Sequence, residues 1–262
     1  MTQNASSLLK TAPIGVFDSG IGGVSVLKHL RQLLPHEDLL YCADSKHAPY
    51  GNKSPEFIRE RSHALTRFLI GQGAKAIVVA CNTATAGAIA SLREHFSLPI
   101  IGMEPAVKPA VEKVDSRRVL VFATPITVRE KKLHDLVERL DSEQTVDLHA
   151  LPVMVEFAEK FIFDEDIIIQ YLLDEFAKYD LREYSAVVLG CTHFIFYRKH
   201  FMKILPQGVE IIDGNIGTVN RLMTLLENRK LGCSSKGSLE FYCSGDKDTD
   251  DSKYRRYLEL EY

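Results

Sequence analysis

The sequence AIVVACNT at residues 76–83 decides the fold, because a similar stretch, AVVLGCTH, recurs at residues 186–193. Both stretches consist of a short apolar run rich in β-branched side chains, followed by a small residue, a cysteine and two polar residues. A run of about five apolar residues without polar alternation predicts a strand that is buried on both faces of a parallel sheet. Cys81 and Cys191 would therefore lie at the carboxyl ends of two such strands, where open α/β sheets bind their ligands.

The composition is typical of a globular protein with one large or two small domains. The chain has 262 residues, of which 45% are apolar and 26% charged, and its net charge of −3 does not favour a nucleic-acid-binding surface. Its five cysteines include no CxxC pair, which argues against a disulfide framework and a structural zinc site. No stretch resembles a signal peptide or a membrane span, so we expect a cytoplasmic protein whose residues 1–12 form a disordered lead-in.

The apolar pattern along the chain alternates between strands and helices, which predicts an α/β fold with mostly parallel sheets and helices on their faces. Asp18 follows a predicted strand 63 residues before Cys81, and Thr124 follows another 67 residues before Cys191. This repeated spacing predicts two similar domains that face each other across a central active site. We assign residues 1–104 and 214–262 to the first domain and residues 105–213 to the second.

Three further predictions concern local structure. Thr127 and Glu130 have the spacing of a capping box, which predicts a helix that begins there and runs to about Leu140. Residues 244–253 are acidic and contain glycine and serine, which predicts a mobile loop. A lone cysteine is most often a small buried apolar residue, and we interpret three of the cysteines in this way: Cys42, Cys233 and Cys243.

The turn after the first predicted strand, DSGIGG at residues 18–23, resembles a phosphate-binding turn at the start of a helix. It is not the dinucleotide-binding fingerprint, because Ser25 stands where the third glycine should be. Backbone N–H groups at such a helix N-terminus bind any anion, including a carboxylate. The alternative is a tight turn that needs glycine only for its backbone conformation.

The two cysteines suggest a chemistry that needs both of them. Each precedes a predicted helix, whose N-terminus can lower the pKa of a thiol and favour the thiolate. A thiolate on one face of a carbon can remove a proton while a thiol on the other face delivers one, which inverts a stereocentre. No lysine lies in a pyridoxal-binding context and the histidines form no metal-binding pair, so we predict no cofactor and no metal. A hydrolase that uses only Cys191 and His193 is the alternative, but it leaves Cys81 unexplained.

Taken together, these stretches resemble the glutamate racemase family. The motifs that carry the resemblance occur in order along the chain: Asp18–Gly23, Tyr41–Asp44, Pro49–Gly51, Ala80–Ala84 and Leu189–His193. The resemblance implies a cofactor-independent isomerase that interconverts L- and D-glutamate and supplies D-glutamate for bacterial peptidoglycan synthesis. It also implies a two-domain fold and a homodimer. Aspartate and hydantoin racemases are the near alternatives, and a non-catalytic ligand-binding module is a more distant one.

The resemblance also implies roles for individual residues. Cys81 would take the proton from D-glutamate and Cys191 the proton from L-glutamate, with Asp18 assisting the first thiol and His193 the second. The positions that match substrate-contacting residues of the family are Asp18, Ser19, Pro49, Tyr50, Gly51, Asn82, Thr83, Thr124, Thr127, Thr192 and His193.

Some of these positions carry more specific expectations. Thr124 and Thr127 match two threonines that flank the side-chain carboxylate of the substrate, and Glu159 matches an acidic residue near the second thiol. The chain departs from the family pattern at Ile126, where a glycine is usual, and at Ile195, where a proline is usual. Neither departure removes a group that proton transfer needs.

Overall fold

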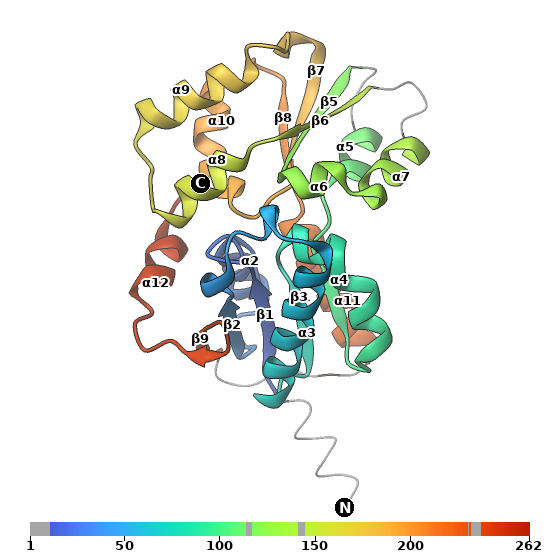
Figure 1. Ribbon diagram of the computed structural model, residues 1–262, viewed down its shortest axis with the longest axis vertical. Helices are drawn as coiled ribbons and strands as arrows, with labels where there is room; N and C mark the ends of the chain where they lie inside the picture. The colour runs from blue at the N-terminus through green and yellow to red at the C-terminus, as the bar shows by residue number, and fades with distance from the viewer. Residues whose placement is uncertain (1–10, 114–116, 141–144, 230, 232–236) are drawn as a thin grey trace, which may run out of the picture.

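The computed structural model describes residues 11–113, 117–140, 145–229, 231 and 237–262. It contains two β-sheets that lie one above the other along the long axis of the molecule, each flanked by helices (Figure 1). The predicted α/β fold class is therefore confirmed. Residues 1–10 of the predicted lead-in, and Cys233, lie outside the described residues.

The first sheet has the strand order β10-β9-β2-β1-β3-β4. Its strands are β1 (Ile14–Asp18), β2 (Leu39–Ala43), β3 (Ala76–Val79), β4 (Ile100–Gly102), β9 (Leu239–Cys243) and β10 (Asp246–Lys247). All described pairs in it are parallel except β9 with β10. Because β9 pairs with β2, the C-terminal part of the chain completes a sheet that the N-terminal part begins.

The second sheet has the order β6-β5-β7-β8 and is parallel throughout its described strands. Its strands are β5 (Arg118–Ala123), β6 (Val146–Ala150), β7 (Tyr184–Leu189) and β8 (Glu210–Asp213). We call the first sheet with its helices the first lobe, and the second sheet with its helices the second lobe. The chain enters the second lobe after β4 and leaves it after β8, while the positions of the domain boundaries stay a prediction.

The central strands are apolar throughout because alternate side chains enter two different cores. Val16 of β1 and Val78 of β3 belong to one hydrophobic cluster, whereas their neighbours Phe17 and Val79 belong to another. Successive side chains of a strand point to opposite faces of the sheet, so both faces of these strands are covered. This is why the sequence shows unbroken apolar runs instead of alternation.

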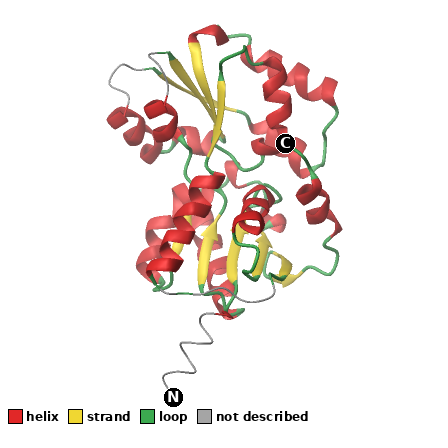
Figure 2. Ribbon diagram, turned by 180° about the vertical axis from the view of Figure 1, so that it is seen from behind, coloured by secondary structure: helices red, strands yellow, loops and turns green. Residues whose placement is uncertain are grey.

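Helices cover both faces of each sheet (Figure 2). In the first lobe, one face carries α2 (Val24–Leu33), α11 (Asn215–Asn228) and α12 (Ser252–Glu259), and the other carries α3 (Pro55–Gly71) and α4 (Asn82–His95). In the second lobe, α5 (Val107–Lys113) and α7 (Lys131–Leu140) lie on one face, with α6 (Pro125–Arg129) beside α7, and α8 (Pro152–Glu159), α9 (Glu165–Phe176) and α10 (Arg198–Ile204) lie on the other.

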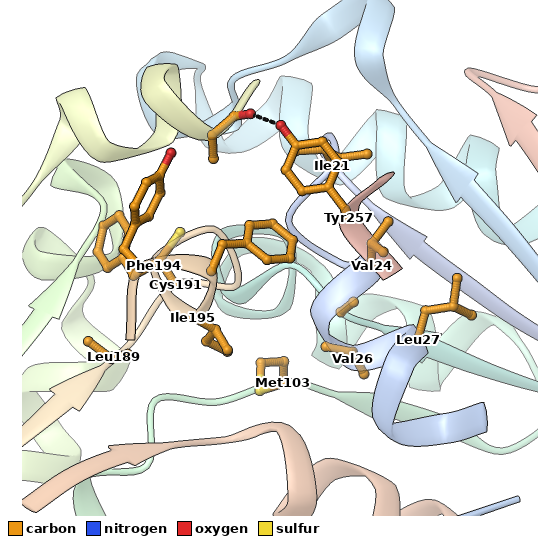
Figure 3. Packing of buried hydrophobic residues seen from close by; sticks show 14 of the residues in the cluster. Ile21, Val24, Val26, Leu27, Met103, Leu189, Cys191, Phe194, Ile195 and Tyr257 are labelled. Atoms are coloured by element: carbon orange, nitrogen blue, oxygen red, sulfur yellow. Dashed lines mark hydrogen bonds between the residues drawn. The ribbon is translucent and has the colours of Figure 1, made fainter. Parts of the chain in front are cut away.

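One of the hydrophobic clusters spans both lobes. It includes Val24 and Leu27 of α2 together with Cys191 and Phe194 of the second lobe (Figure 3). Tyr257 of α12 joins the same cluster and donates a hydrogen bond from its hydroxyl to the carbonyl of Ala158, in α8. This continuous apolar contact fixes the orientation of the two lobes. It therefore determines which residues of one lobe face which residues of the other.

The predicted capping box at Thr127 is wrong. Thr124 is the N-cap of a short helix, α6, and its hydroxyl accepts a hydrogen bond from the backbone N–H of Thr127. Pro125 occupies the first helical position, where a missing N–H costs nothing, so the helix starts three residues earlier than predicted. The backbone is extended at Glu130, which ends α6 and separates it from α7.

The predicted mobile loop at residues 244–253 is also wrong. It contains the strand β10 and the start of α12, because Tyr254 is fully buried and stacks on Phe241 with ring centroids 4.6 Å apart. Asp248 accepts a 3.0 Å hydrogen bond from the Tyr254 hydroxyl, which fixes the turn. Cys42 is fully buried as predicted, whereas Cys243 is only half-buried. No helix in the described part of the chain is long and apolar enough to cross a membrane.

Candidate active site

The two cysteines that the sequence singles out lie at the carboxyl ends of β3 and β7, as predicted. Each is about 5% exposed. Cys81 is the N-cap of α4, and its sulfur accepts a 3.3 Å hydrogen bond from the backbone N–H of Ala84. Cys191 precedes a 3₁₀ turn, Phe194–Tyr197, whose first residue donates its N–H to the Cys191 carbonyl. The two thiols thus come from different sheets.

Both thiols line a single cavity between the lobes. The space within it amounts to about 510 Å³, a figure that includes open solvent. It is lined by Ser19, Pro49, Tyr50, Gly51, Asn52, Cys81, Asn82, Thr83, Thr124, Pro125, Pro152, Val155, Glu156, Cys191, Thr192 and His193.

Most of the residues predicted to bind substrate belong to this lining, but two do not. Asp18 is fully buried and contacts Ser19 and Thr192, which do line the cavity. Thr127 lies within 3.0 Å of Thr124, measured between the hydroxyl oxygens. Asp18 and Thr127 therefore reach the cavity through their neighbours.

His193 connects Cys191 to a carboxylate. Its Nδ1 lies 3.6 Å from the Cys191 sulfur, and its Nε2 lies 2.7 Å from Oε1 of Glu159. The same carboxylate oxygen accepts a 2.9 Å hydrogen bond from the backbone N–H of Ile21, in the other lobe. Glu159, expected near the second thiol, therefore orients the imidazole and also links the lobes.

The charges of His193 and Glu159 stabilise each other. Burial by itself lowers the pKa of His193, but the hydrogen bonds with Cys191 and Glu159 outweigh it and hold that pKa well above its ordinary value. Burial raises the pKa of Glu159, and the hydrogen bond from His193 outweighs that effect and lowers it overall. At neutral pH the pair is therefore an imidazolium beside a carboxylate, with one imidazolium N–H facing the Cys191 sulfur.

Among the residues that the structure describes, the hydrogen-bond partners of the Cys81 sulfur are uncharged. That sulfur lies 3.6 Å from the hydroxyl oxygen of Ser19. Burial, and then the negative charge of Asp18, raise the pKa of Cys81 to about 12. The N–H of Ala84 acts in the opposite direction, as predicted for a helix N-terminus, but it is the weaker effect. Cys81 is therefore a neutral thiol, ready to give a proton, when the cavity is empty.

Asp18 contacts Cys81 through Ser19. Its Oδ1 accepts hydrogen bonds from the Ser19 hydroxyl and from the N–H of Gly20, and its Oδ2 accepts a 3.1 Å bond from the hydroxyl of Thr192. Burial raises the pKa of Asp18, and the charge of His193 opposes that rise. Asp18, which is expected to assist Cys81, is thus also hydrogen-bonded to Thr192, the residue that follows Cys191.

The glycine-rich turn binds carboxylates of the protein itself. The N–H groups of Gly20 and Ile21 donate to Asp18 and Glu159, so these two donors are engaged by side chains of the protein. A Cβ on Gly20 would lie 1.8 Å from Oε1 of Glu159, and one on Gly22 would lie 2.4 Å from the Thr192 hydroxyl oxygen. The glycines are therefore needed because the two lobes approach each other closely here. This reason differs from the two alternatives that the sequence suggests, an anion-binding turn and a tight turn that needs glycine for its backbone conformation.

Three threonine hydroxyls lie close together, two of them on residues that line the cavity. The hydroxyl oxygen of Thr83, in α4, lies 3.0 Å from that of Thr124 and 3.4 Å from that of Thr127. Thr83 comes from the first lobe and the other two from the second. Both α4 and α6 begin here, so their partly positive N-terminal ends add to a set of donors suited to an anionic group.

Five lining residues escaped the sequence analysis: Asn52, Pro125, Pro152, Val155 and Glu156. Asn52 directly follows the Pro49–Gly51 motif and could have been found by extending it. Glu156 and Glu159 are three residues apart in α8, a spacing that places both on one side of a helix. The described residues contain no group of three or more His, Cys, Asp or Glu side chains that could hold a metal ion.

The chain is similar to known proteins in both sequence and structure. Residues 14–222 match the Asp/Glu/hydantoin racemase family. The chain is 50% identical over 249 residues to a glutamate racemase of Halothermothrix orenii, covering 94% of this chain and 98% of that protein. It is 46% identical over 252 residues to glutamate racemase 2 of Bacillus subtilis, covering 94% and 95%. The Escherichia coli glutamate racemase, solved with L-glutamate and the activator UDP-MurNAc-Ala, superposes with a TM-score of 0.82 at 30% identity, covering 94% and 95%.

Proposed function

The chain belongs to the Asp/Glu/hydantoin racemase family, and we propose that it interconverts L- and D-glutamate with Cys81 and Cys191 as the two proton-transfer groups. The observation that carries this proposal is that two thiols from different sheets line one cavity. Inversion at Cα needs a base on one face and an acid on the other, and this arrangement supplies both.

In the L-to-D direction, the Cys191 thiolate takes the proton from Cα of L-glutamate. The Cα–H bond breaks, its electron pair stays on the substrate, and the Cys81 thiol delivers a proton to the opposite face. The product is D-glutamate, with Cys191 now a thiol and Cys81 a thiolate. The reverse reaction starts from that state and restores the first one. Before a second L-to-D turnover, Cys191 must lose its proton and Cys81 must regain one by exchange with solvent.

His193 and Asp18 assist the two thiols. Nδ1 of the His193 imidazolium lies 3.6 Å from the Cys191 sulfur, so a proton donor stands beside the group that attacks L-glutamate. Asp18 raises the pKa of Cys81, which strengthens the thiolate of that residue as a base toward D-glutamate. Glu159 keeps the imidazole of His193 in position.

The rest of the cavity binds the substrate as an ion. The hydroxyls of Thr83 and Thr124, with the N-terminal ends of α4 and α6, receive the side-chain carboxylate, and Thr127 supports them through its contact with Thr124. The α-carboxylate and amino group are held by the other polar lining residues: Ser19, Tyr50, Gly51, Asn82, Thr192 and His193. The fixed donors of Asn82, Thr192 and His193 also stabilise the negative charge that develops when the proton leaves Cα.

Racemisation in deuterated water tests the proposal. Optical rotation of either enantiomer should fall to zero, while mass spectrometry shows one solvent deuterium at Cα of the inverted product. Cys81→Ala and Cys191→Ala should each abolish the reaction. Wild-type rates in either single variant would contradict the two-thiol mechanism. Aspartate and hydantoins serve as alternative substrates, and a covalent acyl adduct on Cys191 with full tolerance of Cys81→Ala would instead indicate a hydrolase.

We also propose a biological setting for the reaction. A bacterial cell needs D-glutamate for peptidoglycan, and an enzyme of this kind would supply it in the cytoplasm, as a homodimer. Light scattering on the purified protein measures the oligomeric state, and D-glutamate auxotrophy on deletion of the gene tests the role in the cell wall.

A further inference from the structure

One buried carboxylate near the cavity takes no part in the proton transfer described above. Asp44 follows β2, and its side chain is fully buried. Arg61 of α3 binds it with two nearly parallel hydrogen bonds, from Nε to Oδ2 at 2.9 Å and from Nη2 to Oδ1 at 2.8 Å. The hydroxyl of Tyr50 donates to Oδ2 at 2.6 Å, and Nδ1 of His47 lies 2.9 Å from Oδ1.

These contacts keep Asp44 charged. Burial alone would raise its pKa, but the hydrogen bonds from Arg61, Tyr50 and His47 outweigh burial and lower that pKa to about 2. A buried charge is tolerated only when it is paired and hydrogen-bonded, so loss of any strong partner leaves a cost that the local structure must relieve by moving. The planar guanidinium fixes orientation as well as charge, because two parallel bonds allow little rotation.

Two of the residues that contact Asp44 belong to a loop that lines the cavity. His47 and Tyr50 belong to the loop of residues 45–52, which consists of two 3₁₀ turns between β2 and α3. Four consecutive residues of this loop line the cavity: Pro49, Tyr50, Gly51 and Asn52. Gly51 also approaches the second lobe, since a Cβ placed on it would lie 3.3 Å from Cβ of Thr124. Neither Asp44 nor Arg61 lines the cavity itself.

We propose that Arg61 and Asp44 are positioning residues that hold the loop of residues 45–52 as a fixed wall of the cavity and thereby set the affinity for both enantiomers of the substrate. Arg61 acts through Asp44, and Asp44 acts through Tyr50 and His47. The loop carries neither thiol and none of the groups that assist them. Its contacts are therefore the same in the ground state and the transition state, and weakening them raises KM while leaving kcat nearly unchanged. The affinity part of this proposal rests on the proposed function, whereas the anchoring of the loop does not.

The test compares Arg61→Met and Arg61→Lys with a matched control, Arg67→Met, an exposed arginine of the same helix. We expect Arg61→Met to raise KM for L- and D-glutamate about tenfold, with kcat within about twofold of wild type, as for loss of a charged hydrogen-bonded partner. Arg61→Lys keeps the positive charge but cannot form both hydrogen bonds of the guanidinium to Asp44. Its KM should therefore lie between those of wild type and Arg61→Met. Arg67→Met should behave as wild type.

Hydrogen–deuterium exchange of the substrate-free enzyme supplies a second measurement. Amides of residues 45–52 should exchange faster in both Arg61 variants than in wild type and the Arg67 control. Unchanged exchange there, or a fall in kcat at constant KM, would overturn the proposal. If Arg61→Met does not fold, Arg61→Lys carries both measurements. If the wild type does not racemise glutamate, the proposed function fails, and the exchange rates still decide whether Arg61 anchors the loop.

Discussion

Cys81 and Cys191 end equivalent strands of two similar sheets, yet their surroundings differ in charge. Cys191 lies beside an imidazolium that Glu159 supports, whereas Cys81 lies beside a neutral serine with the anionic Asp18 behind it. A cation next to sulfur favours a thiolate, and burial near an anion favours a thiol. The repeat therefore supplies two equivalent positions, and the side chains around them supply one base and one acid.

The asymmetry cannot favour one product at equilibrium. Enantiomers have equal free energies in water, so kcat/KM must be the same in both directions for any racemase. The surroundings of each thiol can change only the individual proton transfers, and with them KM and kcat together. Experiments that separate the two transfers are therefore the ones that test the comparison.

The largest effect is expected from the thiols. Cys81→Ser and Cys191→Ser should each lower racemisation about 10³-fold or more, because one proton transfer loses its acid or base. Residual exchange of the Cα hydrogen should then be faster for L-glutamate in Cys81→Ser and for D-glutamate in Cys191→Ser, measured by NMR in deuterated water. The same enantiomer preferred by both variants would break the assignment of one thiol to each face.

The assisting groups come next in size. His193→Asn and Asp18→Asn should each lower kcat about 100-fold, since general acid–base assistance has effects of this order. The deuterium isotope effect with α-deuterated substrate should rise more for L-glutamate in His193→Asn and more for D-glutamate in Asp18→Asn. Equal isotope effects for the two enantiomers in either variant would show that the residue does not serve one thiol.

Gly20→Ala, in the first lobe, disturbs the groups that assist Cys191 in the second lobe. Its Cβ would overlap Oε1 of Glu159, so that flexible carboxylate must leave His193 and the N–H of Ile21. We expect kcat to fall about tenfold, as for loss of a charge-assisted hydrogen bond. Gly71→Ala is the control, because a Cβ there meets nothing within 4 Å. Wild-type activity in Gly20→Ala would mean that Glu159 is not needed to orient the imidazole.

The smallest effect is on stability as a function of pH. His193 has a higher pKa in the folded chain than its ordinary value of 6.5, so its charge contributes stability that is fully present below about pH 6.5. That contribution is lost as pH rises through the folded pKa. Urea unfolding of wild type and His193→Asn should therefore give a difference in free energy that shrinks at alkaline pH. A difference that grows with pH would contradict the ion pair.

The sequence predicted the fold well because its signals are local. The two apolar runs, each followed by cysteine, determine buried strands with a reactive group at the ligand edge, and the motifs between them place most lining residues. Errors occurred where a local pattern had two solutions. Thr124 with Pro125 gives a stronger helix start than Thr127, and the acidic segment after β9 folds because Tyr254 has Phe241 to stack on.

By itself, the sequence determined that two thiols end two parallel strands, that glycines follow the first strand, and that His193 accompanies Cys191. Only the tertiary structure decided that Asp18 reaches Thr192 and that Glu159 reaches both His193 and Ile21. These partners are far apart in the chain, and the pairs Asp18–Thr192 and Ile21–Glu159 come from opposite lobes. The physical reason is that a pKa depends on burial and on charges within a few ångströms, and those distances are set when the lobes pack together.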